Sequence, residues 1–405
     1  MSLDRSEDSW RSLDRSEVSW RGSLGPRLER TALIVAAIGA VGCAVGVAVS
    51  GLDPFFRSYL VGFVFWFGMA FGCLCIQMLH VLSGGAWGVL ARKAFHAASS
   101  TMPVVALLFV PVLLGMRALY PWANPEVVAH DELIRHKAAY LNPAFFIGRS
   151  VFYFAVWSAL ALALYRRAAR RGSREHASRT MRIIAGPGIL ACMLTMTFAA
   201  IDWMQSLDPH WVSTMFGALL IVGTLLSSMA FTIVVVTSEP RSKDDPLPIP
   251  ALHDLGNLLL VFVLVWAYFS FSQYLIIYAG NMAEDSAWYV HRTEAGWQHI
   301  ALALIVLHFA VPFLVLLSRR TKRSPQTIRA VAIGVLVMRL VELYWFVAPN
   351  FGGDHGSGHA GPTPIHLHWM DLCAPMLIGG IWLFWFSRRF GAFVGAQPRR
   401  AARVA

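Results

Sequence analysis

A short polar island decides how this chain is organised: Ile201-Asp-Trp-Met-Gln-Ser-Leu-Asp-Pro-His-Trp211. It lies between two long apolar runs and has the composition of a tight connection between two membrane helices. Asp208-Pro209 is typical of a turn, and the next apolar run begins at Trp211. Asp202, by contrast, still lies in the last turn or so of the preceding run. A carboxylate at that depth requires a physical reason.

Apolar runs of this kind recur along the whole chain. The 405 residues are 57% hydrophobic and 14% charged, and the charges are gathered between apolar stretches of about twenty residues, the span of a bilayer core. The runs are apolar on all sides, whereas strands of a membrane barrel alternate. The sequence therefore predicts an all-α polytopic membrane protein with ten transmembrane helices. The predicted spans are residues 31–50, 58–83, 97–117, 145–165, 182–206, 211–236, 252–279, 297–318, 327–347 and 366–386.

The basic residues predict the orientation of these helices. Seven Lys or Arg lie within residues 166–182 and five within 319–329, and both clusters fall on the same predicted side. Cytoplasmic loops of membrane proteins are rich in Lys and Arg, so both termini are expected in the cytoplasm. The net charge of +11 then reflects topology and contact with anionic phospholipids, and requires no nucleic acid.

Two tails are expected to flank an integral membrane domain over residues 31–390. Residues 1–30 contain a tandem decapeptide of mixed charge and low apolar content, which is typical of a disordered cytoplasmic tail. Residues 391–405 form a second, basic tail.

Cofactor motifs are missing from the sequence. The five cysteines lie in apolar runs, and no Cys-x-x-Cys-His or cysteine-rich segment for covalent haem or an iron–sulfur cluster is present. His308 lies in mid-span without a histidine at equal depth on another helix, which argues against haem b. The outer segment 348–368 contains four histidines without regular ligand spacing, which favours a flexible loop over a metal site. They are His355, His359, His366 and His368.

Three acids on three helices share one depth near the outer face. At 1.5 Å per residue, Asp202, Glu342 and Asp371 lie roughly 6–7 Å below their helix ends. Arg339 lies one turn deeper than Glu342 on the same helix face. The same layer also contains Gln205, Gln273, Tyr274, His299 and His368.

Three interpretations of this layer remain open. It can be a structural network, with Arg339–Glu342 and His368–Asp371 as local pairs. It can be a proton half-channel open to the outer face, because buried carboxylates and histidines near water change protonation near neutral pH. It can also be a quinone head-group pocket, which needs a donor and an acid against a carbonyl.

A second polar group lies toward the cytoplasmic side, with hydroxyls at middle depth between the two groups. His80, His253 and Asp254 are placed where long polar side chains reach the interface. Tyr268 and several Ser and Thr residues in mid-span either bond helix carbonyls or support a file of water between the layers.

Several segments together resemble the F subunit of bacterial alternative complex III, a quinol-oxidising assembly, within the wider group of polysulfide-reductase-C and nitrite-reductase-D membrane subunits. The resemblance covers roughly residues 30–390. The matching pieces are Asp202-Trp-Met-Gln-Ser-Leu-Asp-Pro-His-Trp211, His253-Asp-Leu-Gly-Asn257, Phe271-Ser-Gln-Tyr-Leu-Ile-Ile277 with Gly280-Asn281, Met338-Arg-Leu-Val-Glu-Leu-Tyr-Trp345 and His368-Trp-Met-Asp371.

The resemblance implies a fold and a role. It implies two four-helix bundles, residues 58–206 and 211–347, flanked by the first and last spans. The chain would be a non-catalytic, cofactor-free subunit of a quinol:cytochrome c (or other acceptor) oxidoreductase in the bacterial inner membrane. It would carry proton half-channels in a respiratory or photosynthetic chain. Its partners would be a paralogous quinol-binding subunit, an iron–sulfur subunit and c-type cytochrome subunits, and the docking of a terminal oxidase stays open.

The candidate proton path therefore has an outer and a cytoplasmic part. The outer part contains Asp202, Gln205, Glu342, Arg339, Asp371, His368, His299 and Tyr274. The inner part contains Tyr268, His253, Asp254 and His80. A secondary transporter and a purely structural scaffold of the complex are the alternative functions.

Overall fold

The computed structural model describes residues 24–169, 174–239, 246–351 and 364–395. Regular secondary structure in these ranges consists of helices, without a strand. Ten helical segments are long and apolar enough to cross a membrane, which confirms the predicted fold class. The decapeptide repeat up to residue 23, the tail from residue 396, and His355 and His359 lie outside the described residues.

The first three spans lie on five helices. They are α2 (Leu24–Ser50), α3 (Leu52–Ser83) and a third span built from α4 (Ala86–Ser99), α5 (Met102–Leu108) and α6 (Val110–Leu114). The third span begins at Ala86 and not at the predicted residue 97. Its helix continues through the polar residues before position 97, and His96 is buried by the bundle.

The remaining spans are mostly single long helices. They are α10 (Pro143–Ala169), α11 (Arg174–Trp203), α12 (Phe216–Ser238), α13 (Ile249–Gly280), the consecutive α15 (Trp297–Ala303), η3 (Leu304–Ala310) and α16 (Val311–Leu317), then α18 (Pro325–Val347) and α19 (Met370–Gly395). Short helices form the connections: α7 (Met116–Leu119), η1 (Pro121–Ala123), α8 (Pro125–His130), α9 (Glu132–Lys137), η2 (Gln205–Leu207), α14 (Ala283–Thr293), α17 (Arg319–Arg323) and η4 (Ala348–Asn350).

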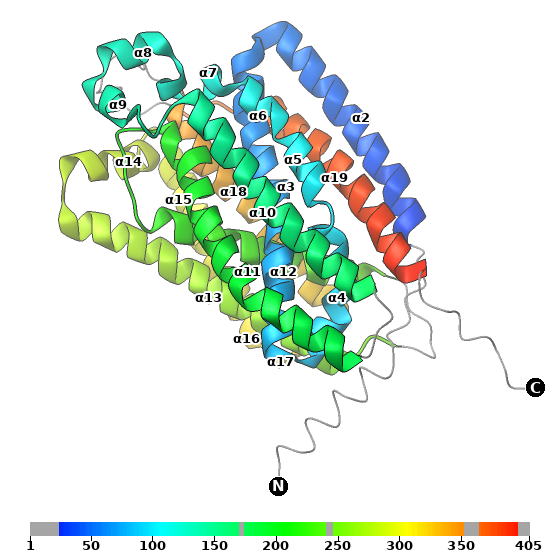
Figure 1. Ribbon diagram of the computed structural model, residues 1–405. Coiled ribbons are helices and arrows are strands. Elements are labelled where there is room, and N and C mark those ends of the chain that lie inside the picture. Colours follow the sequence, from blue (N-terminus) through cyan, green and yellow to red (C-terminus); the bar gives the residue numbers. More distant parts are fainter. Residues whose placement is uncertain (1–23, 170–173, 240–245, 352–363, 396–405) are drawn as a thin grey trace, which may run out of the picture.

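The spans pack as two four-helix bundles with two flanking helices. In the first bundle, α3 contacts α4 and α11, while α10 contacts α5 and α11. In the second bundle, α12 contacts α13 and α18, while η3 and α16 contact both α13 and α18. The bundles join where α3 meets α12, and α2 packs along α19 on the outside of α3 (Figure 1).

Small residues permit the closest of these helix contacts. A side chain at Gly39 of α2 would overlap the backbone of α19 at Leu377. At the join between the bundles, the Ser228 hydroxyl of α12 donates to the Gly68 carbonyl of α3 at 2.8 Å. Close backbone approach and hydroxyl bonding are how helices associate where lipid supplies no hydrophobic drive.

The two ends of the molecule differ in structure and charge. The start of α2 and the end of α19 lie at one end, which we call the terminal face, together with α17 (Figure 1). The helices α8, α9 and α14 cover the opposite end, the far face (Figure 1). The arginine-rich α17 and the Arg388-Arg389 pair near the end of α19 belong to the terminal face. Both described ends of the chain thus lie on the more basic side.

Candidate functional site

Asp202 is the buried acid of the first bundle. It lies one residue before the end of α11 and its side chain is 0% exposed. Arg149 of α10 holds it from two sides, with Nε donating to Oδ2 and Nη2 to Oδ1, each at 2.8 Å. The Tyr153 hydroxyl donates to Oδ2 at 2.9 Å. The guanidinium in turn lies over the Tyr140 ring at 3.8 Å from its centroid. Both carboxylate oxygens are therefore bonded.

Glu342 is the buried acid on the fourth helix of the second bundle. It lies on α18 with 2% exposure, and the Trp266 indole of α13 donates to its Oε1 at 2.8 Å. Arg339 donates to Oε2 from one turn earlier on the same helix, which confirms the predicted local pair. His308 lies on η3 with its Nε2 3.6 Å from the same Oε2, and it is fully buried. Three helices of the bundle thus meet at this carboxylate.

Asp371 forms a third cluster, between α19 and α3. Its Oδ1 accepts from the Ser58 hydroxyl at 2.6 Å, and its Oδ2 accepts from the His368 backbone N–H at 2.9 Å. Arg57 lies 3.8 Å from Oδ2. The His368 ring contacts the Ser50 hydroxyl, at 3.0 Å from Nε2. The predicted pairing of His368 with Asp371 is thus made through the backbone of the histidine.

The polar island that joins α11 to α12 is a pinned hairpin. The Gln205 carboxamide lies where it can accept from the Ser213 N–H at 2.9 Å and donate to the Ser213 carbonyl at 3.1 Å. Asp208 accepts from the His210 N–H, as expected of turn chemistry. Ser213 also donates its hydroxyl to Gln273 of α13. The hairpin therefore fixes the start of the second bundle against the end of the first.

Far-face helices cover this hairpin. Lys137 of α9 donates to the Pro209 carbonyl at 2.7 Å, and the Trp211 ring stacks on Trp288 of α14 at 4.5 Å. The Arg292 guanidinium lies 3.7 Å from the centroid of Trp288 and donates to the Phe346 carbonyl at 2.9 Å. Burial lowers the pKa of Arg292 to about 9, so this cation costs desolvation free energy. Its hydrogen bonds attach α14 to the end of α18.

Three residues of the predicted path lie apart from these clusters. Tyr268 and Tyr274 of α13 point outward, with the Tyr268 side chain 65% exposed. His299 is exposed near the start of α15 and its Nδ1 contacts the Gly296 carbonyl. Their depth agrees with the predicted layer, but their helix faces do not turn toward the buried acids.

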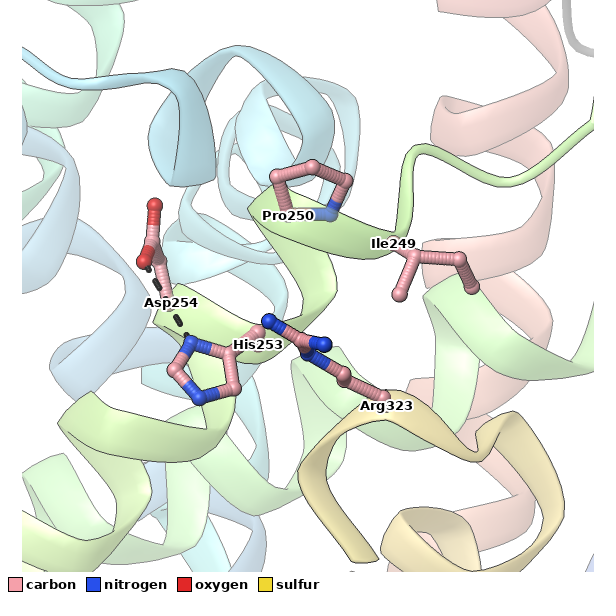
Figure 2. Close-up of a pocket in the computed structure, with 5 residues that line it drawn as sticks. All are labelled: Ile249, Pro250, His253, Asp254 and Arg323. Carbon is pink, nitrogen blue, oxygen red and sulfur yellow. Dashed lines mark ion pairs between the residues drawn. The ribbon is translucent and has the colours of Figure 1, made fainter. Parts of the chain in front are cut away.

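The predicted cytoplasmic group lies on the terminal face in two places. His253, Asp254 and Arg323 line a pocket of about 350 Å³ between the start of α13 and α17 (Figure 2). His253 Nδ1 lies 3.9 Å from Asp254 Oδ1 (Figure 2). His80 lies in the last turn of α3 and does not line this pocket; its Nε2 is 3.1 Å from the Gly85 carbonyl and its ring lies edge-on to Trp87.

Five of the mid-depth hydroxyls bond helix carbonyls, whereas the buried Ser270 hydroxyl has no partner among the described residues. Thr195 donates to Ala191 O at 2.6 Å, and Ser227 donates to Gly223 O at 2.8 Å. The same pattern holds for Thr197, Thr224 and Thr232. This is the simpler of the two predicted roles.

The described part of the chain can be searched for groups of side chains that could bind a metal ion. There, no three His, Cys, Asp or Glu side chains lie close enough together to hold a metal ion. His366 and His368, the two described histidines of the outer segment, differ in their contacts. The His366 carbonyl accepts from the Tyr344 hydroxyl, and the His368 ring accepts from the Met370 N–H.

Two comparisons with known proteins found no relative of this chain. The chain matches no protein-family model, and a search of curated proteins finds no match. The function of this chain is therefore inferred from its own residues and from the resemblance of its motifs.

Sequence reasoning missed the partners of Asp202, and it missed His308 as a neighbour of Glu342. Arg149 and Tyr153 are spaced i and i+4 at the far end of α10, so they share a helix face, and this pattern was available as a signal. His308 was considered only as a haem ligand. Its depth inside an apolar span was the usable signal, because ionisable groups there pair with one another.

Proposed function

We propose that this chain is a membrane-integral subunit, without its own redox centre, of a quinol-oxidising electron-transfer complex of the alternative complex III type. In this proposal the chain carries half-channels for protons. One observation carries it: each bundle buries one carboxylate on its fourth helix beside a guanidinium, Asp202 with Arg149 and Glu342 with Arg339. A buried ionisable residue in a membrane span is a functional candidate because its burial is costly.

The motifs that carry the family resemblance support the proposal by their location. Asp202 and Gln273 come from two of these motifs, Arg339 and Glu342 come from a third, and all four residues are buried in the interior. Asp371, from a further motif, bonds Ser58 across the contact between α19 and α3. Motif residues that only fixed topology would have no reason to converge on buried polar clusters.

The outer surface of α13 supports a place in a larger membrane complex. Six exposed side chains follow each other at alternating spacings of three and four residues, the spacing of a helix–helix seam. They are Val261, Leu264, Tyr268, Phe271, Leu275 and Tyr278. Tyr268 lies near the middle of the span, where a phenol hydroxyl facing hydrocarbon lacks a partner at a free-energy cost. A transmembrane helix of the paralogous subunit would cover this seam.

The basic terminal face supports the bacterial inner membrane with that face in the cytoplasm. Lys and Arg are favoured in cytoplasmic segments and near anionic phospholipid. The outer clusters around Asp202, Glu342 and Asp371 then lie nearer the periplasm, where the proposed c-type cytochrome subunits would receive electrons.

Purification in mild detergent tests the proposal. A tagged chain should co-purify with subunits that show c-type haem absorbance and iron–sulfur signals, and the preparation should oxidise a quinol. Glu342→Gln should lower proton release per electron while the same subunits still co-purify. His299→Gln is the matched control, because His299 is exposed and contacts only a backbone carbonyl among the described residues. A chain that purifies alone and takes up a small solute would instead be a secondary transporter.

A structural scaffold is favoured for the first bundle alone. Both Asp202 oxygens are bonded to Arg149 and Tyr153, as expected of an ion pair that fastens α10 to α11. If Asp202→Asn and Glu342→Gln both leave proton release unchanged in an assembled complex, the whole chain is a scaffold.

A further inference from the structure

His308 lies inside the second bundle, in an irregular turn of the eighth span. Residues 304–310 form a π-helical segment, in which the Val311 N–H bonds the Val306 carbonyl, five residues back. Pro312 lacks the N–H that would bond the His308 carbonyl in a regular α-helix, so the ladder is interrupted at this point. Single π-helical turns occur frequently at functional sites.

The inward face of this segment carries Leu304 and His308, which lie one turn apart. Ile305, Val306 and Leu307 are exposed on the surface, whereas the His308 side chain is fully buried. Its ring lies edge-on to Trp266, with the ring centroids 4.4 Å apart, and its Nε2 lies 3.6 Å from Glu342 Oε2. An imidazole in a span otherwise suited to lipid contact requires a polar neighbour, and here that neighbour is a carboxylate.

Three buried nitrogen atoms around this carboxylate have no hydrogen-bond partner among the described residues: His308 Nδ1, His308 Nε2 and Arg339 Nη2. Buried polar atoms are almost always bonded to protein or to ordered water, so each unbonded one calls for a bound species. In the first bundle, by contrast, both Asp202 oxygens and the Arg149 nitrogens are bonded.

The charges that face His308 come from α18. Arg339 and Glu342 form a neutral pair there, and α13 contributes the uncharged Trp266. The helix α12 approaches the guanidinium with Gly223 and carries no titratable side chain between Phe216 and Ser238. A neutral imidazole therefore leaves the cluster uncharged, and one added proton gives it a single positive charge beside a carboxylate.

We propose that His308, Arg339 and Glu342 bind an internal water molecule and that this cluster takes up and releases one proton. On uptake, a hydronium proton leaves its oxygen and forms an N–H bond with the imidazole, and water remains. On release the same bond breaks toward water. The binding of this proton stands on the geometry of the cluster, whereas its use in transport rests on the proposed function.

Fluorine NMR of the purified chain tests the proposal without any partner subunit. Trp266 contacts both His308 and Glu342, so in protein labelled with 5-fluorotryptophan its resonance should shift in one step between pH 4 and pH 10. Trp266→Phe assigns this signal. The shift should be lost in His308→Gln and in Glu342→Gln and retained in His299→Gln. Trp382, a buried indole that bonds the Thr101 hydroxyl, gives an internal reference that should not titrate.

Two results would overturn the proposal: a Trp266 resonance that stays constant over this pH range in the wild-type chain, or a titration that persists in folded His308→Gln. The wild-type measurement alone decides the matter if a variant fails to fold. A titrating Trp266 in a chain without haem-containing partners contradicts the proposed function and leaves the proton site standing. A constant resonance in a chain that does co-purify with haem-containing partners contradicts the proton site and leaves the proposed function standing.

Discussion

Replacing Asp202 by Asn should destabilise the protein more than any other single amide substitution on its acids. The Asp202 side chain is fully buried, and that of Arg149 is 10% exposed. Asn keeps the shape but offers one oxygen and two N–H donors to a guanidinium that donates from two nitrogens. One N–H group of the new amide then faces an N–H group of the guanidinium, and the two donors cannot bond each other. The Arg149 charge also has no counter-ion in the cluster.

The magnitude follows from the geometry of the pair. Removing one partner of a buried ion pair costs about 3–5 kcal/mol, because the remaining charge is uncompensated. Tyr153→Phe removes a single hydrogen bond to the same carboxylate and should cost about 1.5–3 kcal/mol. Asp254→Asn on the terminal face is the matched control. Its side chain is 49% exposed, so the expected change is about 0–1 kcal/mol.

Reversible unfolding in mixed micelles or by steric trapping measures these free energies. A double-mutant cycle separates the pair from the rest of the site. Arg149→Met combined with Asp202→Asn should cost less than the sum of the single variants, because the double variant holds no unpaired charge. An Asp202→Asn variant within about 1 kcal/mol of the wild type, or strictly additive costs in the cycle, would show that Asp202 and Arg149 do not form a stabilising buried ion pair.

Three further predictions concern other parts of the chain. Tyr268→p-benzoylphenylalanine should crosslink in native membranes to the paralogous membrane subunit, identified by mass spectrometry, whereas the same label at Leu190, exposed on α11, should not; equal yields would contradict a specific seam. Burial lowers the pKa of Lys137, so below its ordinary pKa of 10.5 the unfolded chain binds more protons than the folded one. The free energy of unfolding should therefore rise from pH 8 to pH 10.5, and this rise should vanish in Lys137→Met. An identical pH profile in the variant would contradict this role of Lys137. Gly223→Ala should cost about 1–3 kcal/mol, because its methyl group would overlap the guanidinium beside the buried glutamate, while Gly334→Ala in open space should be neutral or slightly stabilising; equal effects would show that this contact does not matter.

Depth along each span was predictable from sequence because the helical rise is constant. Counting residues from the end of a run placed Asp202, Glu342 and Asp371 near the outer ends of their helices. The structure has them close to the far ends of α11, α18 and α19. The number of spans and the hairpin at 201–211 followed from the same reading of run lengths and turn residues.

Rotation of a helix about its axis was much harder to predict. A span that is apolar on every side has no polar stripe to mark its inner face, so depth alone grouped Tyr274 and His299 with the buried acids. The structure turns both side chains outward. The partner of Asp202 was missed for a related reason: Arg149 lies at a helix mouth, where an arginine facing water and one facing a carboxylate look alike in sequence.

The irregular eighth span shows a second limit of sequence reasoning. Hydropathy predicts a continuous helix over residues 297–318, and Pro312 indicates only that its hydrogen-bond ladder is disturbed. Which side chains of this span face inward depends on the neighbouring helices. The burial of His308 against Trp266 and Glu342 therefore required coordinates.

The two bundles hold similar charged groups in different states of hydrogen bonding, and this difference separates their roles. A proton added to Asp202 would have to displace one of three donors, because Arg149 and Tyr153 occupy both oxygens. At Glu342 the neighbouring His308 can accept a proton without breaking any bond, since both of its ring nitrogens are unbonded among the described residues. The hairpin at 201–211 ties the two sites together, because it ends the helix of Asp202 and begins the second bundle. On this argument, the first carboxylate fixes the frame within which the second exchanges its proton.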